Sequence, residues 1–245
     1  RTFTKDNITI SVVGDITPEE LSNVLDDVFS DLPGSFLGDG VGEGVIENQG
    51  ETVIINKEIP QSVVIFGSNG IKRGDPDWYA AIILFEILSG GFGSRLTEEI
   101  REKRGLTYGV SAYPLPLEKA GIIVGSVSTV NNRVAESIRL IKDIWQKFGH
   151  HGPTPEEIRN AKDYINGSFA LRFTDSKSIA GVLNAVQHFD LGVDYLKNRP
   201  ELINSVTLKQ LKRVANRLFK ANALTFAIVG QPENVISTLP APVIR

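Results

Sequence analysis

Hydrophobic positions recur along the chain with two different spacings, which predict short strands separated by helices. Alternating runs rich in β-branched residues predict strands, because these side chains suit a pleated, half-buried surface. Apolar residues three and four positions apart predict helices with one buried face. The predicted strands are residues 8–13, 52–56, 62–66, 106–113, 121–128 and 224–229. The predicted helices are residues 17–28, 77–88, 94–103, 131–150, 154–170, 176–190 and 207–219.

The order of these elements predicts an α+β fold. The strands arrive in pairs with helices between the pairs, which favours a mostly antiparallel sheet over a regular βαβ winding. Residues 33–50 contain six glycines and almost no periodicity, so we expect a flexible linker there. The linker would separate a closing strand and helix in residues 1–32 from a main domain over residues 51–245.

Two helices carry clear start or stop signals. Thr17 in the N-cap position, followed by Pro18 and by Glu20 three residues on, predicts a capping box. Gly105 predicts the end of the helix over residues 94–103, because glycine readily adopts the left-handed backbone that ends helices.

The two ends of the chain resemble each other. With an offset of 216, residues 1–15 align without a gap with residues 217–231, and five of the 15 positions are identical. Either this is an internal repeat, or two apolar strands that end in Val-Gly are alike by chance. A true repeat implies that the chain starts at the closing strand of one copy, with on the order of 200 residues of that copy before it.

Composition and charge argue against several classes of function. The 26 basic and 29 acidic residues give a net charge of −3 without a block of like charge, which argues against a nucleic-acid partner or an anionic membrane surface. No apolar run reaches the roughly 18–20 residues of a membrane-spanning helix. The absence of cysteine excludes thiol catalysis, disulfides and cysteine metal sites.

The three histidines have spacings that do not suit a catalytic metal. His150 and His151 are adjacent at a predicted helix end, where neighbouring side chains point about 100° apart. His188 has no second histidine at ligand spacing, and no His-x-x-Glu-His motif occurs in either direction. We therefore predict no metal site and assign no catalytic residue. A Ser–His–Asp triad stays open, because its members can come from any part of a chain.

The segment from Gly90 to Tyr108 holds the candidate binding residues. The turn Gly91-Phe92-Gly93 precedes a helix, where backbone N–H groups can receive a carboxylate or a peptide carbonyl; a tight turn between two helices is the other interpretation. Arg101 lies near the end of that helix and Tyr108 lies beyond it. An arginine and a phenol hydroxyl can hold a carbonyl from two sides, although alternating charges around Arg101 also suit a solvated helix face.

The same segment resembles a known family. Residues 90–108, GGFGSRLTEEIREKRGLTY, are similar to the C-terminal half of insulinase-type zinc peptidases, the family of pitrilysin and the mitochondrial processing peptidases. Residues 8–17, 61–67, 125–136 and 192–207 extend the resemblance to nearly the whole chain. It implies two homologous halves that close around an unfolded peptide, each with a mostly antiparallel sheet covered by helices on one face.

The resemblance also implies a function. Arg101 and Tyr108 would bind a peptide substrate. The family's N-terminal half carries the zinc motif, with its glutamate as general base for a zinc-bound water, and this chain lacks that motif. We therefore expect the substrate-binding half of a zinc-dependent endopeptidase, inactive alone, with zinc bound by an N-terminal half or a catalytic partner subunit. The alternative is a non-catalytic or structural subunit of the same fold. Family habit in bacteria favours the periplasm or cell envelope.

Overall fold

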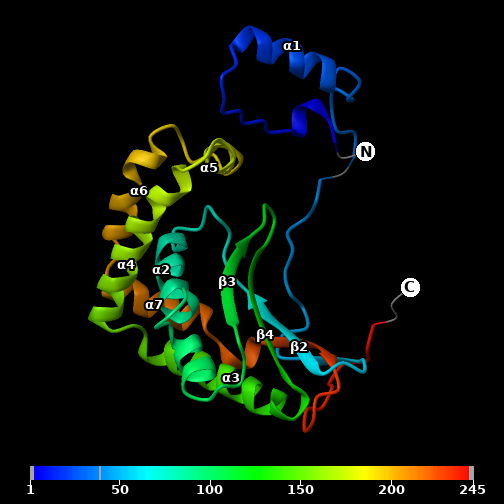
Figure 1. The fold of residues 1–245 in the computed structure, drawn as a ribbon, viewed down its shortest axis with the longest axis vertical. Helices are drawn as coiled ribbons and strands as arrows, with labels where there is room; N and C mark the ends of the chain where they lie inside the picture. Colours follow the sequence, from blue (N-terminus) through cyan, green and yellow to red (C-terminus); the bar gives the residue numbers. More distant parts are fainter. Residues whose placement is uncertain (1–2, 39, 243–245) are drawn as a thin grey trace. The chain divides into compact units, whose positions relative to one another are not determined.

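The structure, a computed structural model, describes residues 3–38 and 40–242 (Figure 1). The strands are β1 (Thr52–Asn56), β2 (Gln61–Asn69), β3 (Val110–Pro116), β4 (Gly121–Val130) and β5 (Thr225–Gly230). The helices are α1 (Pro18–Phe29), α2 (Trp78–Ser89), α3 (Val134–His151), α4 (Pro155–Phe169), α5 (Ser176–His188), α6 (Tyr195–Asn204) and α7 (Leu208–Leu218), with a single π-helix, η2 (Thr97–Glu102), among the described residues. The described residues fall into two units: a smaller unit within 1–42 and 166–200, and a sheet unit within 43–165 and 201–245.

The sheet unit contains a five-stranded sheet in the order β1-β5-β2-β4-β3. β1 runs parallel to β5, and the other three pairings are antiparallel. β2 is the central strand, and its Val64 lies opposite Ile228 of β5 and Val127 of β4. The predicted mostly antiparallel sheet is confirmed.

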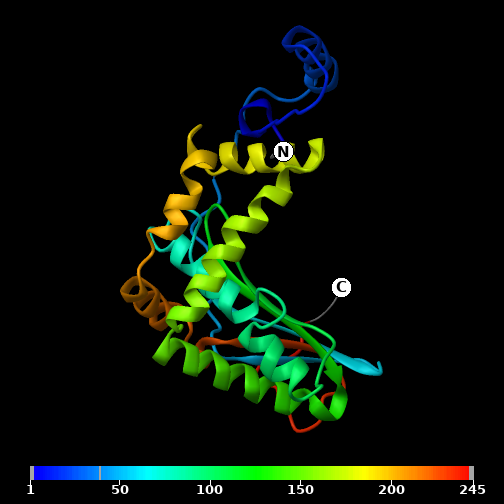
Figure 2. The same cartoon turned by 60° about the vertical axis from the view of Figure 1, so that its left-hand side comes forward.

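Helices α2, α3 and α7 cover one face of this sheet (Figures 1 and 2). Successive residues of β2 alternate between the two faces, so Val64 and Phe66 are buried beneath the helices. The Trp145 ring of α3 packs edge-on against Phe66, with ring centroids 5.9 Å apart. The expected α+β fold, with helices on one face of the sheet, is confirmed.

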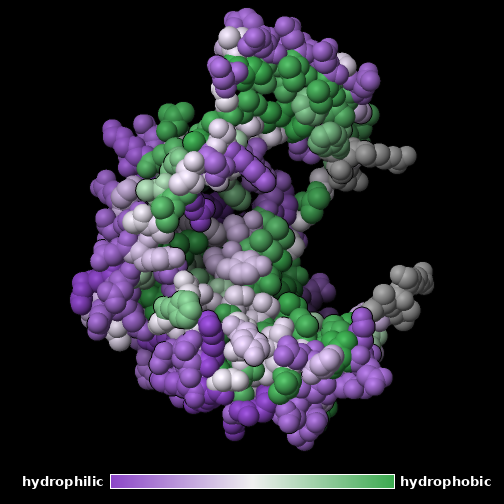
Figure 3. Space-filling model, viewed as in Figure 1, coloured by the Kyte–Doolittle hydropathy of each residue, from purple (hydrophilic) through white to green (hydrophobic). Residues whose placement is uncertain are grey.

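The opposite face of the sheet carries partly exposed apolar side chains. The strand register places on this face Val63, Ile65, Tyr113 and Val130, which are between 41% and 50% exposed. Figure 3 shows hydrophobic residues over β3 and β4. The sheet is therefore one-sided, with its core between the strands and the helical layer.

Two arginines of α7 bind the N-terminal end of α2. Arg213 and Arg217 both donate to the buried carboxylate of Asp77, Arg213 through Nη1 at 2.8 Å and Arg217 through Nη1 at 2.7 Å. Arg217 also donates to Asp75 at 2.8 Å. The hydrogen bonds from Arg213, followed by those from Arg217, outweigh burial and hold the pKa of Asp77 below its usual value. Charge and apolar packing therefore both fix α2 against α7.

Strand β3 begins four residues later than predicted. Leu106 and Thr107 are buried, but the Thr107 hydroxyl donates to the carbonyl of Ser128 at 2.7 Å and takes the place of a ladder bond there. β3 is an edge strand of the sheet. Its prolines, Pro114 and Pro116, lack an N–H group and are tolerated at such an edge.

Helix α6 is a helix that the sequence pattern does not predict. Pro200 lies inside it, and Ile203 is the single buried residue among its described residues. An internal proline normally argues against a helix. A single buried position gives no periodic spacing of hydrophobic residues from which a helix could be predicted. No helix in the described part of the chain is long and apolar enough to cross a membrane.

The smaller unit confirms one prediction and corrects another. In α1, Thr17 Oγ1 accepts from the Glu20 N–H at 3.2 Å, and the Glu20 carboxylate accepts from the Thr17 N–H at 2.9 Å, which is the predicted capping box. The prediction of a strand over residues 8–13 is wrong, because these residues pair with no strand of the described structure. The carbonyl of Thr9 instead accepts from Asn184 Nδ2 at 3.1 Å. An extended segment forms a strand only when a second strand pairs with its backbone.

Candidate functional site

The turn between α2 and η2 depends on glycine. The Gly90 N–H donates to the Glu86 carbonyl at 2.8 Å and ends α2. Gly91 and Gly93 have φ angles of +127° and +82°, which side chains with a Cβ rarely adopt. Phe92, between them, is 84% exposed. The predicted turn is confirmed, and its contact with a peptide stays a prediction.

The helix after this turn is wound more widely than the sequence predicts. An ordinary helix is expected over residues 94–103, but Thr97–Glu102 form the π-helix η2, and the Lys103 N–H donates to Glu98 five residues back at 3.0 Å. Leu96 and Ile100 are fully buried and anchor it. Single π-helical turns occur frequently at functional sites.

Gly105 ends this helix, as predicted. Its φ is +57°, and its N–H donates to the Arg101 carbonyl at 2.9 Å. The Leu106 N–H donates to the Ile100 carbonyl at 3.0 Å. The first bond spans four residues, as in the simple αL cap, and the second spans six residues, one more than in a Schellman motif, beside the π-helical turn. The backbone around Arg101 is therefore fixed by the cap.

The Arg101 side chain lies against the glycine turn. Its guanidinium carbon is 5.0 Å from the centroid of the Phe92 ring, within the range of a cation–π contact. Its Nε is 3.4 Å from the carboxylate of the adjacent Glu102, and both side chains are partly exposed. Arg101 is therefore not held in a buried ion pair. The structure brings together two residues that the sequence analysis lists as separate candidates.

Tyr108 lies in a bend two residues before β3 and is 90% exposed. The expectation that it begins the strand is corrected, because the Thr107 hydroxyl accepts from the Gly109 N–H at 3.1 Å and holds a bend at this point. Among the described residues, no hydrogen bond joins the Tyr108 hydroxyl to Arg101 or to another side chain. A shared ligand for Arg101 and Tyr108 stays a prediction.

A cavity of about 550 Å³ lies beside the turn, between α2 and α4. Phe92 forms part of its wall, together with Asn160 and Tyr164 of α4. Glu86 of α2 also lines it, and burial raises the pKa of this carboxyl group. Glu86 is a site residue that sequence reasoning missed. Its signal in the sequence is that it is the one charged residue in the apolar helix WYAAIILFEILS.

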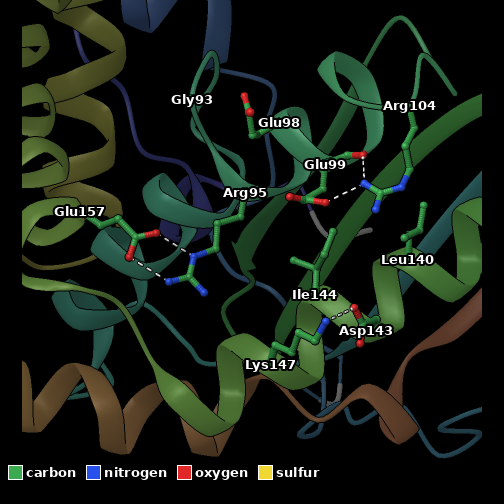
Figure 4. Close-up of a pocket in the computed structure, with 10 residues that line it drawn as sticks. All are labelled: Gly93, Arg95, Glu98, Glu99, Arg104, Leu140, Asp143, Ile144, Lys147 and Glu157. Carbon is green, nitrogen blue, oxygen red and sulfur yellow. Dashed lines mark hydrogen bonds and ion pairs between the residues drawn. The ribbon is translucent and has the colours of Figure 1, made fainter.

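A second cavity, of about 470 Å³, is lined by ion pairs (Figure 4). Arg95 holds Glu157 with two hydrogen bonds, Nε to Oε1 at 2.7 Å and Nη2 to Oε2 at 2.8 Å. The Arg95 guanidinium also lies 4.5 Å from the Phe148 ring centroid. Burial alone would raise the pKa of Glu157, but the bonds from Arg95 and from the Thr154 N–H lower it. This cluster fixes α4 beside the start of η2, and its charges already compensate each other.

The described residues do not fit a zinc ion. They include no group of three His, Asp or Glu side chains that could hold a metal. His150 and His151 end α3, and His188 ends α5 with its ring against Phe189, at a centroid distance of 4.7 Å. We derive no chemical step on a metal from this chain.

Comparison with known proteins gives a family for this arrangement. The family model described as "peptidase M16 inactive domain" matches residues 1–165. An uncharacterized zinc protease of Bacillus subtilis, YmxG, is 29% identical over 224 residues, which cover 89% of this chain and 52% of that protein. A Helicobacter pylori protein named non-peptidase homolog YmxG is 30% identical over 238 residues, which cover 94% of this chain and 53% of that protein. The chain thus spans about half the length of these relatives.

A solved structure agrees with this family. The crystal structure of a peptidase M16 inactive domain from Pseudomonas fluorescens superposes with a TM-score of 0.78 at 27% sequence identity. The superposition covers 94% of this chain and 54% of that chain.

Proposed function

Since the chain belongs to the peptidase M16 inactive-domain family of zinc-protease-like proteins, we propose that it is the substrate-binding half of a zinc-dependent endopeptidase. Zinc would be bound by an N-terminal half or by a catalytic partner subunit. This chain would hold an extended peptide in place for cleavage. Alone, it would cleave no peptide.

The observation that supports the proposal is the contact of the partly exposed Arg101 with the exposed Phe92, in the same glycine-rich segment as the exposed Tyr108. An extended peptide presents backbone carbonyls, which accept hydrogen bonds from a guanidinium or a phenol hydroxyl. The exposed Phe92 ring offers an apolar contact beside them. The π-helix, its glycine cap and the buried Leu96 and Ile100 hold the backbone that carries Arg101, which supports a role for Arg101 in binding.

A binding or structural subunit is the second candidate. The relative from Helicobacter pylori, which is 30% identical over 238 residues, is named a non-peptidase homolog. The two candidates differ in one measurement on the complete protein supplied with zinc. A peptidase turns over a peptide that it binds, whereas a binding subunit binds the peptide and releases it unchanged.

The test uses Arg101→Ala, Tyr108→Phe and the double variant in the complete protein. Loss of a charge-assisted hydrogen bond costs about 1.5–3 kcal/mol, so Arg101→Ala should lower kcat/KM at least about tenfold. Tyr108→Phe removes a neutral bond and should lower kcat/KM about two- to tenfold. Arg139→Ala, on the exposed side of α3, is the matched control and should change nothing. Unchanged cleavage by the double variant would contradict the roles of Arg101 and Tyr108.

A further inference from the structure

Glu86 is a carboxylate without a partner in an apolar setting. It is half-buried, and among the described residues no hydrogen bond or ion pair involves its side chain. A Cβ atom at Gly90 would overlap Glu86 Oε1. The carboxylate is therefore folded onto the backbone at the start of the glycine turn, in space that the glycine leaves open.

The cavity beside Glu86 has an acidic and apolar lining. The described residues that line it include two acids, Glu86 and Glu157, and no basic residue, beside Ile87, Phe92 and Tyr164. Glu157 is already bound by Arg95, so Glu86 is the acid left to compensate. The volume of the cavity, about 550 Å³, lies in the range of ligand pockets.

The chemistry of this lining selects a cation. A partly desolvated carboxylate is stabilised by an opposite charge. Burial raises the pKa of Glu86, and no ion pair among the described residues involves its carboxylate. Aromatic and aliphatic walls suit the methylene stem of a long basic side chain. An acidic ligand side chain would be repelled, and a neutral one would leave the carboxylate uncompensated.

Phe92 connects this cavity to the peptide-binding residues. The same ring lines the cavity and lies under the Arg101 guanidinium. We infer that the cavity is a subsite for a basic group of the bound peptide, with Glu86 as its counter-ion. The inference rests on the proposed function, because it assumes that the segment around Phe92 binds peptide.

The experiment compares peptides in the complete protein. The peptides are identical except at one scanned position, which carries Lys, Arg, Gln or Glu, and each is made with a free and with an acetylated N-terminus. The wild-type protein should bind the Lys or Arg peptide at least about tenfold more tightly than the Gln peptide at one position. If this preference persists after acetylation, the cation is the side chain. If no side chain is preferred but acetylation weakens every peptide at least about tenfold, the cation is the terminal amine, and either result supports the subsite.

Two variants test the role of Glu86. Glu86→Gln should remove the preference for the basic peptide and leave the affinity for the Gln peptide within about twofold, because the side chain keeps its shape. Glu86→Lys should reverse the preference toward the Glu peptide. Glu118→Gln, an exposed acid in the β3–β4 turn, is the matched control and should behave like wild type. Melting temperatures of all variants establish that they are folded.

The outcomes separate this inference from the proposed function. If wild-type protein binds peptides but Glu86→Gln keeps the full preference for the basic peptide, the subsite is wrong and the proposed function stands. If wild-type protein prefers no charge at any position and acetylation leaves the affinity unchanged, the subsite is likewise wrong. If wild-type protein binds no peptide at all, both the subsite and the proposed function are overturned.

Discussion

The guanidinium carbon of Arg101 lies 5.0 Å from the centroid of the Phe92 ring, which joins the end of η2 to the tip of the glycine turn. Arginine side chains have many rotamers, and fixing one costs entropy. If Arg101 binds a peptide as proposed, a ring that holds the guanidinium would reduce that cost. Phe92 would then act through Arg101 in addition to its own contacts.

Replacing Phe92 tests this relationship. Phe92→Leu removes the cation–π contact, worth about 0.5–1 kcal/mol at an exposed site, so peptide affinity should fall about two- to fivefold. Phe92→Tyr keeps an aromatic face and should retain wild-type affinity. The measurement is the Kd of a fluorescent peptide on the complete protein. Equal affinities for the leucine and tyrosine variants would show that the ring does not act on Arg101.

Alanine substitutions at Gly105 and Gly167 should change the free energy of unfolding in opposite directions. Gly105 has a φ of +57°, where alanine is strained, so Gly105→Ala should lower the free energy of unfolding by about 1 kcal/mol. Gly167 lies inside α4 with open space around its Cα, so Gly167→Ala should stabilise by about 0.4–1 kcal/mol. Urea denaturation of both variants gives the two values. Stabilisation by Gly105→Ala would contradict the helix cap.

Because of the ion pairs of Asp77, the stability of the protein should fall at low pH. The hydrogen bonds from Arg213 and Arg217 lower the pKa of Asp77 in the folded protein. Their contribution to the free energy of unfolding is therefore complete above the unfolded pKa near 3.8. It is lost as the pH falls further, through the lowered folded pKa. Asp77→Asn should therefore cost about 1–3 kcal/mol at pH 7 and progressively less below about pH 4. Thermal unfolding of both proteins from pH 7 to pH 3 measures this cost. A cost that stays the same at every pH would contradict the prediction.

The effect of Glu86 on stability should depend on pH in the opposite direction. Burial raises its pKa, so the folded protein carries a penalty for ionising Glu86 that is absent below the unfolded pKa near 4.5 and complete above the folded pKa. Glu86→Gln should raise the melting temperature at pH 7 and leave it unchanged near pH 4. Because the group is half exposed, water limits the gain to below about 1 kcal/mol, which corresponds to at most about 2–4 °C. A lower melting temperature at pH 7 would show that the carboxylate has a cationic partner in the protein.

Local signals in the sequence predict those parts of the structure that depend on neighbouring residues. The capping box of Thr17 and Glu20, the stop at Gly105 and the alternation along β2 all arise within a few positions of one another. The family resemblance carried by residues 90–108 is confirmed by the match to the M16 inactive-domain family.

The parts that sequence reasoning misses depend on distant partners. Residues 8–13 have the composition of a strand but no strand beside them in the described structure. The contact of Arg101 with Phe92 depends on how the turn folds back onto the wide turn of η2, which no spacing reveals. Glu86 becomes notable only when α4 closes a cavity around it.

The position of β5 in the sheet has a consequence for how the protein is made. β5 is the last strand in the sequence, yet it lies between β1 and β2, and β1 pairs with no other strand of the described sheet. Strands β2, β4 and β3 can pair with one another before β5 is synthesised. Until then β1 and the edge of β2 that β5 covers stay unpaired, and Phe226 and Ile228 are missing from the core. During that time the exposed strand edge is open to chaperones and to aggregation.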